Sequence, residues 1–148
     1  IMLPLSVQKF HKYEMEQNYK EVAEELGIYN LGNKYPSEIS GGQQQRTAAA
    51  RAFVHKPTII FADEPTGALD SKSAQDLLHR LEDMNKQFNS TIMMVTHDPS
   101  AASYAERVIM LKDSDILSEI YQGNDSKQTF YQEIMKLQTA LGGVTHDI

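Results

Sequence analysis

The sequence predicts an α/β fold in which a parallel sheet is flanked by helices. Two short apolar runs, at 58–62 and 90–95, alternate with segments whose apolar residues have helical spacing. Parallel strands need crossover helices of this kind, because each strand must begin at the same edge of the sheet. We expect one domain over 1–148, with a helical subdomain at 1–56 and a sheet-containing half at 57–148 that ends in a hairpin and a helix.

Composition and charge narrow the class of protein. The 148 residues carry a formal net charge of −6 with scattered Lys and Arg, so we expect no nucleic-acid partner. The absence of cysteine excludes disulfides and thiolate metal sites. The sequence has no apolar run of about 18 residues and no signal-peptide pattern. We therefore expect any attachment to a membrane to depend on a partner.

The N-terminal region is charged and helix-permissive. Residues 7–26 predict two short helices, with Val22, Ala23 and Leu26 at helical spacing before a glycine stop. Asn, Gly, Tyr and Pro dominate 28–36, which predicts a connection.

The stretch 27–34 has two glycines at the spacing of a phosphate-binding loop, G-x-x-x-x-G-K-[ST], but Asn33 stands at the lysine position. Such a loop also has to follow a strand. We therefore interpret 27–34 as an interhelical turn and expect no phosphate-binding loop in this chain.

A helix is expected to begin at Ser40-Gly41-Gly42-Gln43. Ser40 and Gln43 form a capping-box pattern, and the alanine-rich run behind them favours a helix to Val54. Alone, Ser-Gly-Gly is more typical of an ordinary helix start. Glycines also let a backbone approach an anion, and a helix N-terminus directs unpaired N–H groups toward it. The segment is therefore suited to bind a phosphate.

The strand expected at 58–62 runs directly into two carboxylates, Asp63 and Glu64. A short apolar run of this kind predicts a buried strand whose carboxyl end faces a site. The second strand, 90–95, is also expected to be buried, and His97 follows it at the same edge of the sheet.

Two helices are expected after these strands. Asp70 or Ser71 predicts the N-cap of the first, and Asp98 with Pro99 predicts the start of the second, which we expect to reach about residue 106. The first helix carries an apolar stripe that predicts core packing, formed by Ala74, Leu77, Leu78, Leu81, Met84 and Phe88.

The C-terminal part predicts a hairpin and a last helix. Runs at 108–111 and 116–120 flank a turn in which Ser114 accepts a positive φ less readily than glycine does. Residues 126–141 predict a helix that stops at a glycine pair, with one apolar face formed by Phe130, Ile134, Leu137 and Leu141.

Taken together, residues 39–46, 58–70 and 96–98 resemble the C-terminal part of the ATP-binding-cassette (ABC) ATPases. The resemblance covers nearly the whole chain. It implies a partial P-loop NTPase fold, with ATP and Mg²⁺ as the bound groups and ATP hydrolysis as the reaction. Residues 64–71 are similar to those of bacterial macrolide, lipoprotein-release and antimicrobial-peptide exporters, and 141–143 favour the bacitracin-type exporters.

The resemblance also implies roles for single residues. Asp63 matches the carboxylate that holds Mg²⁺ through a water, and Glu64 matches the residue that polarises the attacking water. His97 matches the histidine that touches the γ-phosphate and that water. The implied nucleotide-binding residues are Ser40, Gly41, Gly42, Gln43 and Asp70, the last in a loop that crosses a dimer interface. We expect a bracing role for Gln44, Gln45 and Arg46.

The implied protein is an ATPase subunit of a transporter. Two copies are expected to close head to tail on two ATP·Mg²⁺ and to drive export of a substrate, such as an antimicrobial peptide, through a transmembrane permease. This places the subunit at the cytoplasmic face of the cell membrane.

The chain opens on Ile1 and lacks a phosphate-binding loop, so we expect it to be part of such a subunit and inactive alone. We also expect an exposed sheet edge that favours self-association. Two alternatives stay open: a non-catalytic interaction module, and a soluble ABC ATPase of DNA repair or translation.

Overall fold

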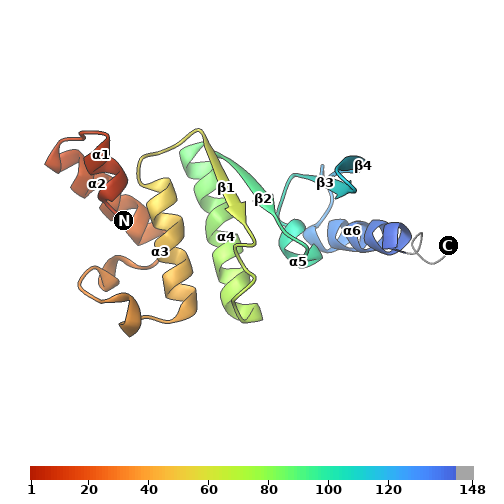
Figure 1. Ribbon diagram of the computed structural model, residues 1–148, viewed down its shortest axis with the longest axis horizontal. Coiled ribbons are helices and arrows are strands. Elements are labelled where there is room, and N and C mark those ends of the chain that lie inside the picture. The colour runs from red at the N-terminus through yellow and green to blue at the C-terminus, as the bar shows by residue number, and fades with distance from the viewer. Residues whose placement is uncertain (143–148) are drawn as a thin grey trace. The chain divides into compact units, whose positions relative to one another are not determined.

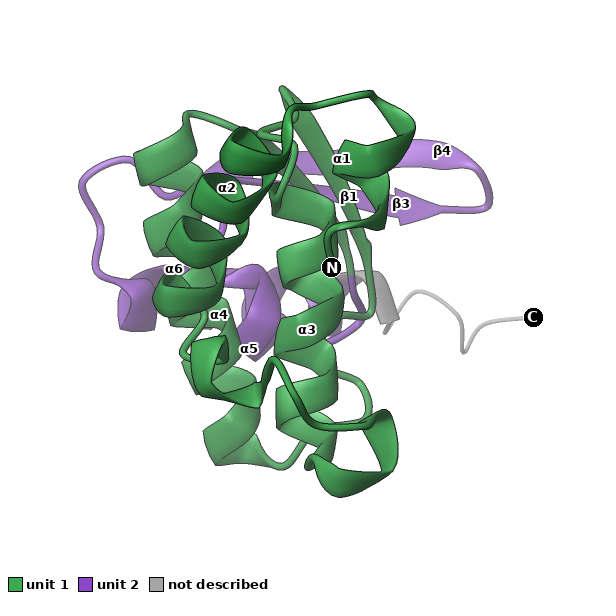
Figure 2. Cartoon of the chain, turned by 90° about the vertical axis from the view of Figure 1, so that its left-hand side faces the viewer, with its two compact units in different colours: residues 1–95 green, residues 96–148 purple. Residues whose placement is uncertain are grey.

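The computed structural model describes residues 1–142. The chain divides into two compact units, Ile1–Val95 and Thr96–Ile148. Figure 2 shows the first unit in green and the second in purple. The division into 1–56 and 57–148 expected from the sequence stays a prediction.

Helices and a short parallel sheet make up the first unit (Figure 1). Its elements in chain order are α1 (Leu3–Val7), α2 (Lys12–Glu25), η1 (Tyr29–Leu31), η2 (Pro36–Glu38), α3 (Gly41–Phe53), β1 (Ile59–Asp63), α4 (Ser71–Phe88) and β2 (Thr91–Val95). The two elements marked η are single 3₁₀ turns.

The expectation of two short helices within 7–26 is wrong, because α2 is one continuous helix. No Gly or Pro interrupts it, and two ion pairs support its successive turns, Lys12 with Glu16 and Lys20 with Glu24, each at 3.9 Å. The other helix of this region, α1, lies earlier in the chain and has a proline in its first turn.

The stretch 27–34 is a turn, as predicted. Gly27 has a φ of 63°, in the left-handed region that glycine adopts without strain. The turn follows α2 and contains η1, so it does not have the strand–loop–helix arrangement of a phosphate-binding loop.

β1 and β2 pair in parallel, from Ile59↔Thr91 to Asp63↔Val95, which confirms the predicted sheet. The expectation that both strands are buried is wrong. Ile60 is 8% exposed, whereas Phe61 is 73% and Met93 53% exposed. Successive side chains point to opposite faces of a strand, and within this unit the residues that cover Ile60 come from helices packed on one face.

The core of the first unit brings together α2, α3, α4 and β1. The apolar stripe predicted on α4 supplies Leu77, Leu81 and Met84 to it, which confirms that part of the sequence analysis. The buried residues of this cluster are Val22, Ala23, Leu26, Ile28, Leu31, Ala50, Phe53, Ile60, Leu77, Leu81 and Met84.

The second unit contains α5 (Pro99–Ala102), β3 (Arg107–Lys112), β4 (Asp115–Tyr121) and α6 (Lys127–Gly142). Asp98 caps α5 by accepting a hydrogen bond from the Ser100 N–H at 2.8 Å. The expectation that this helix reaches about residue 106 is wrong. The Ser103 hydroxyl donates to the Ser100 carbonyl at 2.7 Å, and side-chain hydrogen bonds of this kind compete with the helical ladder.

β3 and β4 form the predicted hairpin, from Arg107↔Tyr121 to Lys112↔Asp115. The turn residues Asp113 and Ser114 have φ values of 52° and 70°. Two positive φ values are typical of a type I′ turn, whose twist matches that of the flanking strands. Ser114 therefore adopts the conformation in which glycine is preferred.

The last helix, α6, buries Phe130 and Ile134, as its apolar spacing predicts. Residues 143–148 and the side chain of Leu141 lie outside the described residues, so the glycine stop and the bacitracin-exporter motif at 141–143 stay predictions. None of the helices described within 1–142 combines the length and the apolarity needed to cross a bilayer.

Candidate functional site

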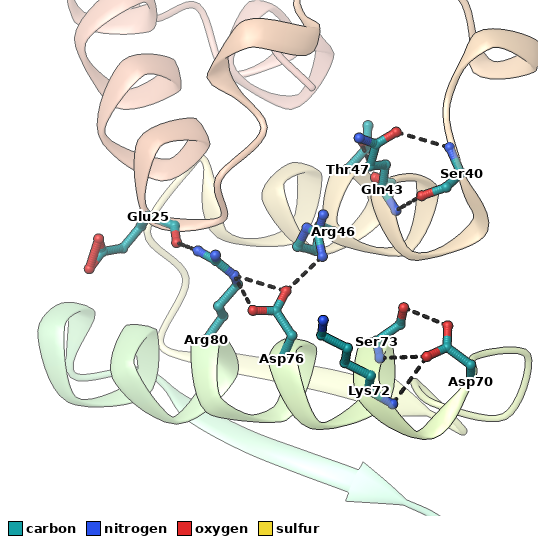
Figure 3. Close-up of polar contacts among 10 residues, drawn as sticks. All are labelled: Glu25, Ser40, Gln43, Arg46, Thr47, Asp70, Lys72, Ser73, Asp76 and Arg80. Atoms are coloured by element: carbon teal, nitrogen blue, oxygen red, sulfur yellow. Dashed lines mark hydrogen bonds and ion pairs between the residues drawn. The ribbon is translucent and has the colours of Figure 1, made fainter.

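Ser40 forms the N-cap of α3 in the predicted capping box (Figure 3). The Gln43 N–H donates to the Ser40 Oγ at 3.3 Å, and the Ser40 N–H donates to the Gln43 Oε1 at 2.9 Å. The Ser40 hydroxyl accepts in this arrangement, so its own hydrogen can be directed toward a ligand. Ser40 is exposed, and the first turn of the helix is therefore open to an anion on that side.

Gly41 and Gly42 differ in their surroundings, although they are adjacent in the sequence. Apart from its chain neighbours and the nearby backbone of its own helix, no described atom lies within 4 Å of the position that a Cβ on Gly41 would take. A Cβ on Gly42 would lie 3.3 Å from the Cβ and the Oγ of Ser73 on α4. Gly41 can therefore face a ligand, while Gly42 permits close packing of α3 against α4.

The three polar residues after Gln43 brace α3, as predicted. The Gln44 Nε2 donates to the Pro36 carbonyl at 3.0 Å. The Gln45 Nε2 donates to the Pro65 carbonyl at 2.9 Å, and the Arg46 Nη1 to the Asp76 Oδ2 at 2.7 Å. These side chains hold α3 against three separate segments of the first unit.

Asp63 and Glu64 stand at the end of β1. Asp63 is the last residue of the strand and is exposed, and Glu64 is half-buried with a φ of 42°. The Glu64 N–H donates to the Val95 carbonyl at 2.8 Å, which continues the pairing of the two strands by one bond. A non-glycine residue with positive φ stores backbone strain, and such residues cluster at functional sites. No sequence signal indicated this conformation.

Asp70 ends the loop that follows Glu64 and caps α4. Its carboxylate accepts from the Ser73 Oγ at 2.7 Å, from the Ser73 N–H at 3.0 Å and from the Lys72 N–H at 3.1 Å (Figure 3). These hydrogen bonds, led by that of the Ser73 hydroxyl, hold the pKa of the Asp70 carboxyl below its ordinary value. The loop is thus tied to the sheet at one end and to α4 at the other.

His97 lies in the second unit, two residues after β2 ends, and is exposed. Its carbonyl accepts a hydrogen bond from the Gln138 Nε2 on α6 at 3.3 Å. Within the first unit, Gly42 lies against Ser73, whose N–H and hydroxyl bond the Asp70 carboxylate. Gln45, in the helix that Ser40 caps, bonds the Pro65 carbonyl in the loop after Glu64. The placement of His97 beside Asp63 and Glu64 stays a prediction.

The chain is similar to known ATP-binding proteins. A family model described as ABC transporter matches residues 3–67. The chain is 58% identical to the bacitracin export ATP-binding protein BceA of Halalkalibacterium halodurans, over 99% of the chain and 58% of that protein. It is 51% identical to the macrolide export ATP-binding/permease protein MacB of Psychrobacter cryohalolentis, over 72% of the chain and 16% of that protein.

A solved structure shares the fold. The dimeric, post-hydrolysis structure of the ATP-binding cassette MJ0796 bound to ADP and Pi matches with a TM-score of 0.68 and 36% identity, over 82% of this chain and 54% of that one. The chain thus spans little more than half the length of these ATP-binding relatives, BceA and MJ0796.

Proposed function

Because the chain belongs to the family of ABC transporter ATP-binding proteins, we propose that it contributes to ATP hydrolysis in a transporter of that family. The observation that supports this most directly is the hydrogen bond from the Gln45 amide to the Pro65 carbonyl at 2.9 Å. It joins α3, which Ser40 caps, to the turn that follows Glu64. A phosphate-binding helix start and a strand-end carboxylate pair are thereby held in one compact unit.

The start of α3 is the proposed contact to the phosphates of ATP. Ser40 supplies a hydroxyl hydrogen, Gly41 leaves the backbone accessible, and the first turn adds N–H groups and the positive end of the helix dipole. Gln43 keeps this turn in place through the capping box.

Asp63 and Glu64 are the proposed metal-side and water-side carboxylates. Mg²⁺ commonly binds through one or two carboxylates together with phosphate oxygens and water, and the exposed carboxylate of Asp63 fits that pattern. Bound Mg²⁺ would neutralise charge that develops on the phosphates. Glu64 would orient and polarise the attacking water, with His97 as a further contact to that water and the γ-phosphate.

The working unit in this proposal is a head-to-tail dimer bound to a transmembrane permease. Within 1–148 no segment has the G-x-x-x-x-G-K-[ST] pattern, so the loop that cradles the phosphates lies outside these residues. Asp70 would face the second copy, and the permease would hold the dimer at the cytoplasmic face of the membrane. By similarity to BceA, a peptide antibiotic is the proposed class of exported substrate.

Calorimetry tests the part played by the chain alone. We expect 1–148 to bind no ATP at micromolar concentrations, because the phosphate loop is not among these residues. Binding of ATP to 1–148 with a micromolar Kd would contradict the proposal that the phosphate-binding loop lies outside these residues.

The Glu64→Gln substitution tests the catalytic assignment in the full-length protein with its permease. We expect ATP turnover to fall by about a hundredfold or more, because an amide cannot polarise the attacking water. Glu133→Gln, an exposed change of the same chemistry on α6, serves as the matched control. Unchanged turnover in Glu64→Gln would overturn the assignment of Glu64.

A further inference from the structure

Three side chains form a polar chain that links α3, α4 and the end of α2 (Figure 3). The Arg46 Nη1 lies 2.7 Å from the Asp76 Oδ2. The Arg80 Nε lies 3.3 Å from both carboxylate oxygens of Asp76. The Arg80 Nη1 then donates to the Glu25 carbonyl, the last residue of α2. Asp76 is therefore the acceptor shared by two guanidinium groups.

The Arg46 end of this series of contacts is more buried than the Asp76 carboxylate. The Arg46 side chain is 17% exposed, Arg80 32% and Asp76 42%. The Arg46 Nε is buried and has no hydrogen-bond partner among the described residues, and the Asp76 carboxylate pairs with this guanidinium through Nη1. Removal of one member of a partly buried pair leaves an uncompensated charge, which costs more than the loss of an exposed pair.

At the Arg80 end of this series of contacts, the guanidinium lies close to the backbone at Gly27. A Cβ on Gly27 would lie 3.1 Å from the Arg80 Nη2, so the Arg80 guanidinium occupies the space that a side chain would need there. Its bond to a carbonyl at the C-terminal end of α2 also places positive charge at the negative end of the helix dipole. Arg80 therefore fixes the end of α2 relative to α4.

We propose that Asp76 is a positioning residue that sets the orientation of α3, and with it the Ser40 capping turn, relative to α2. The inference rests on the proposed function, because orientation of Ser40 matters only if that turn meets a phosphate. Asp76 itself contacts no reacting atom in this scheme. It is joined to α3 by Arg46, and to the end of α2 by Arg80, which lies on α4 and bonds the Glu25 carbonyl. A displacement of α2 would therefore be passed to the Ser40 turn.

Another ion pair on α4 provides a matched control. Glu82 pairs with Lys86 at 3.0 Å and with His79 at 4.0 Å along the same helix, so neither of these two ion pairs joins α4 to a second element. If Asp76 merely stabilised α4 by its charge, Glu82→Ala and Asp76→Ala would have similar effects on helix orientation. Positioning predicts an effect for Asp76 alone.

Spin labels measure this orientation without nucleotide. The sequence has no cysteine, so Lys20→Cys on α2 and Arg51→Cys on α3, both exposed, give one defined label pair. We expect a narrow distance distribution by pulsed electron paramagnetic resonance in the parent chain and in Glu82→Ala. Asp76→Ala should broaden the distance distribution, and Asp76→Glu, which keeps the charge, should retain the narrow one. An unchanged distribution in Asp76→Ala would overturn the proposal.

Asp76→Asn keeps the size of the side chain and removes its charge. It therefore separates loss of the charge from misfolding of the chain. We expect it to retain the far-UV circular dichroism of the parent chain and yet to broaden the label distance, because it cannot neutralise two guanidinium groups. If Asp76→Asn gives the parent distribution, the charge of Asp76 does not position α3, and the proposal fails.

Kinetics of the full-length protein with its permease separate this proposal from the proposed function. We expect Asp76→Ala to lower kcat by about tenfold or more, because a misplaced contact is costly in the transition state. The KM for ATP should change by less than about twofold, since the phosphate loop lies elsewhere. Asp76→Glu should recover most of the rate.

Two outcomes distinguish the proposed function from the positioning role of Asp76. No ATP hydrolysis by the unsubstituted protein would overturn the proposed function, while the label distances would still report whether Asp76 positions α3. Normal hydrolysis with an unaffected kcat in Asp76→Ala would overturn the positioning role alone.

Discussion

Asp70 combines a structural role with a proposed functional one. Its carboxylate accepts three hydrogen bonds at the start of α4, from the Ser73 hydroxyl and from the N–H groups of Ser73 and Lys72. The same group is predicted to face a second copy of the protein. Because the cap is exposed, its charge can be tested in solution without disturbing the core.

The hydrogen bonds to Asp70 predict a dependence of stability on pH. They lower the pKa of this carboxyl below its ordinary value of 3.8, so the charged form favours the folded state. This contribution is present above the unfolded-state pKa and is lost as the pH falls through the lowered, folded-state pKa. We expect the unsubstituted chain to lose stability between about pH 5 and pH 2 more steeply than Asp70→Asn.

Thermal unfolding followed by circular dichroism across this pH range measures the difference. Asn caps helices nearly as well as Asp, so the comparison isolates the charge. Asp83→Asn, an exposed change on the same helix, corrects for the altered net charge. A melting-temperature difference between the parent and Asp70→Asn that stays constant from neutral to acid pH would contradict the prediction.

At the scale of elements, the two glycines at the start of α3 separate ligand access from helix packing. A Cβ at Gly42 would press on Ser73, 3.3 Å away, whereas one at Gly41 would meet no described atom within 4 Å. Both substitutions to alanine gain similar helix propensity. We therefore expect Gly42→Ala to be less stable than Gly41→Ala by about 1 kcal/mol in urea denaturation, because Ser73 must move.

The more stable variant, Gly41→Ala, is expected to be the less active one. In the full-length protein, Gly41→Ala should impair ATP hydrolysis, since its methyl group would stand where the backbone approaches a phosphate. Equal free energies of unfolding for the two variants would contradict the prediction, because Ser73 would then move aside without loss of stability.

The elements that could be predicted from the sequence are those fixed by local hydrogen bonds. The helix starts at Ser40, Asp70 and Asp98 depend on partners two or three residues away, so a short pattern identifies them. The hairpin was also predictable from its flanking strands, although its turn lacks glycine. The parallel pairing of β1 and β2 followed from the alternation of strands with helices.

The features that the sequence did not predict depend on distant parts of the chain. Burial of β1 was overestimated because its composition does not say which face a neighbour covers. The contact of Gly42 with Ser73 and the pair of Arg46 with Asp76 join residues about thirty positions apart and have no local pattern. The positive φ of Glu64 likewise has no local sequence pattern, and its N–H bonds the Val95 carbonyl about thirty positions along the chain.

At the scale of the whole molecule, the exposed face of the sheet in the first unit has the largest consequence. Ile59, Phe61, Met93 and Val95 are 46%, 73%, 53% and 57% exposed. Within the described residues, each strand of this sheet pairs on one side only. Exposed apolar strands with unpaired edges attract other strands. We therefore expect the chain to self-associate through this face with a second copy.

Sedimentation velocity over a range of concentrations tests this expectation. The unsubstituted chain should sediment with a mass that rises with concentration, whereas Phe61→Glu should stay monomeric, because burial of a carboxylate against apolar side chains is unfavourable. Tyr13→Glu is the matched control, since Tyr13 is also 73% exposed but belongs to a helix, α2, and not to the sheet. A monomer at every concentration would contradict the prediction, and equal loss of association in both variants would assign it to net charge instead of the sheet face.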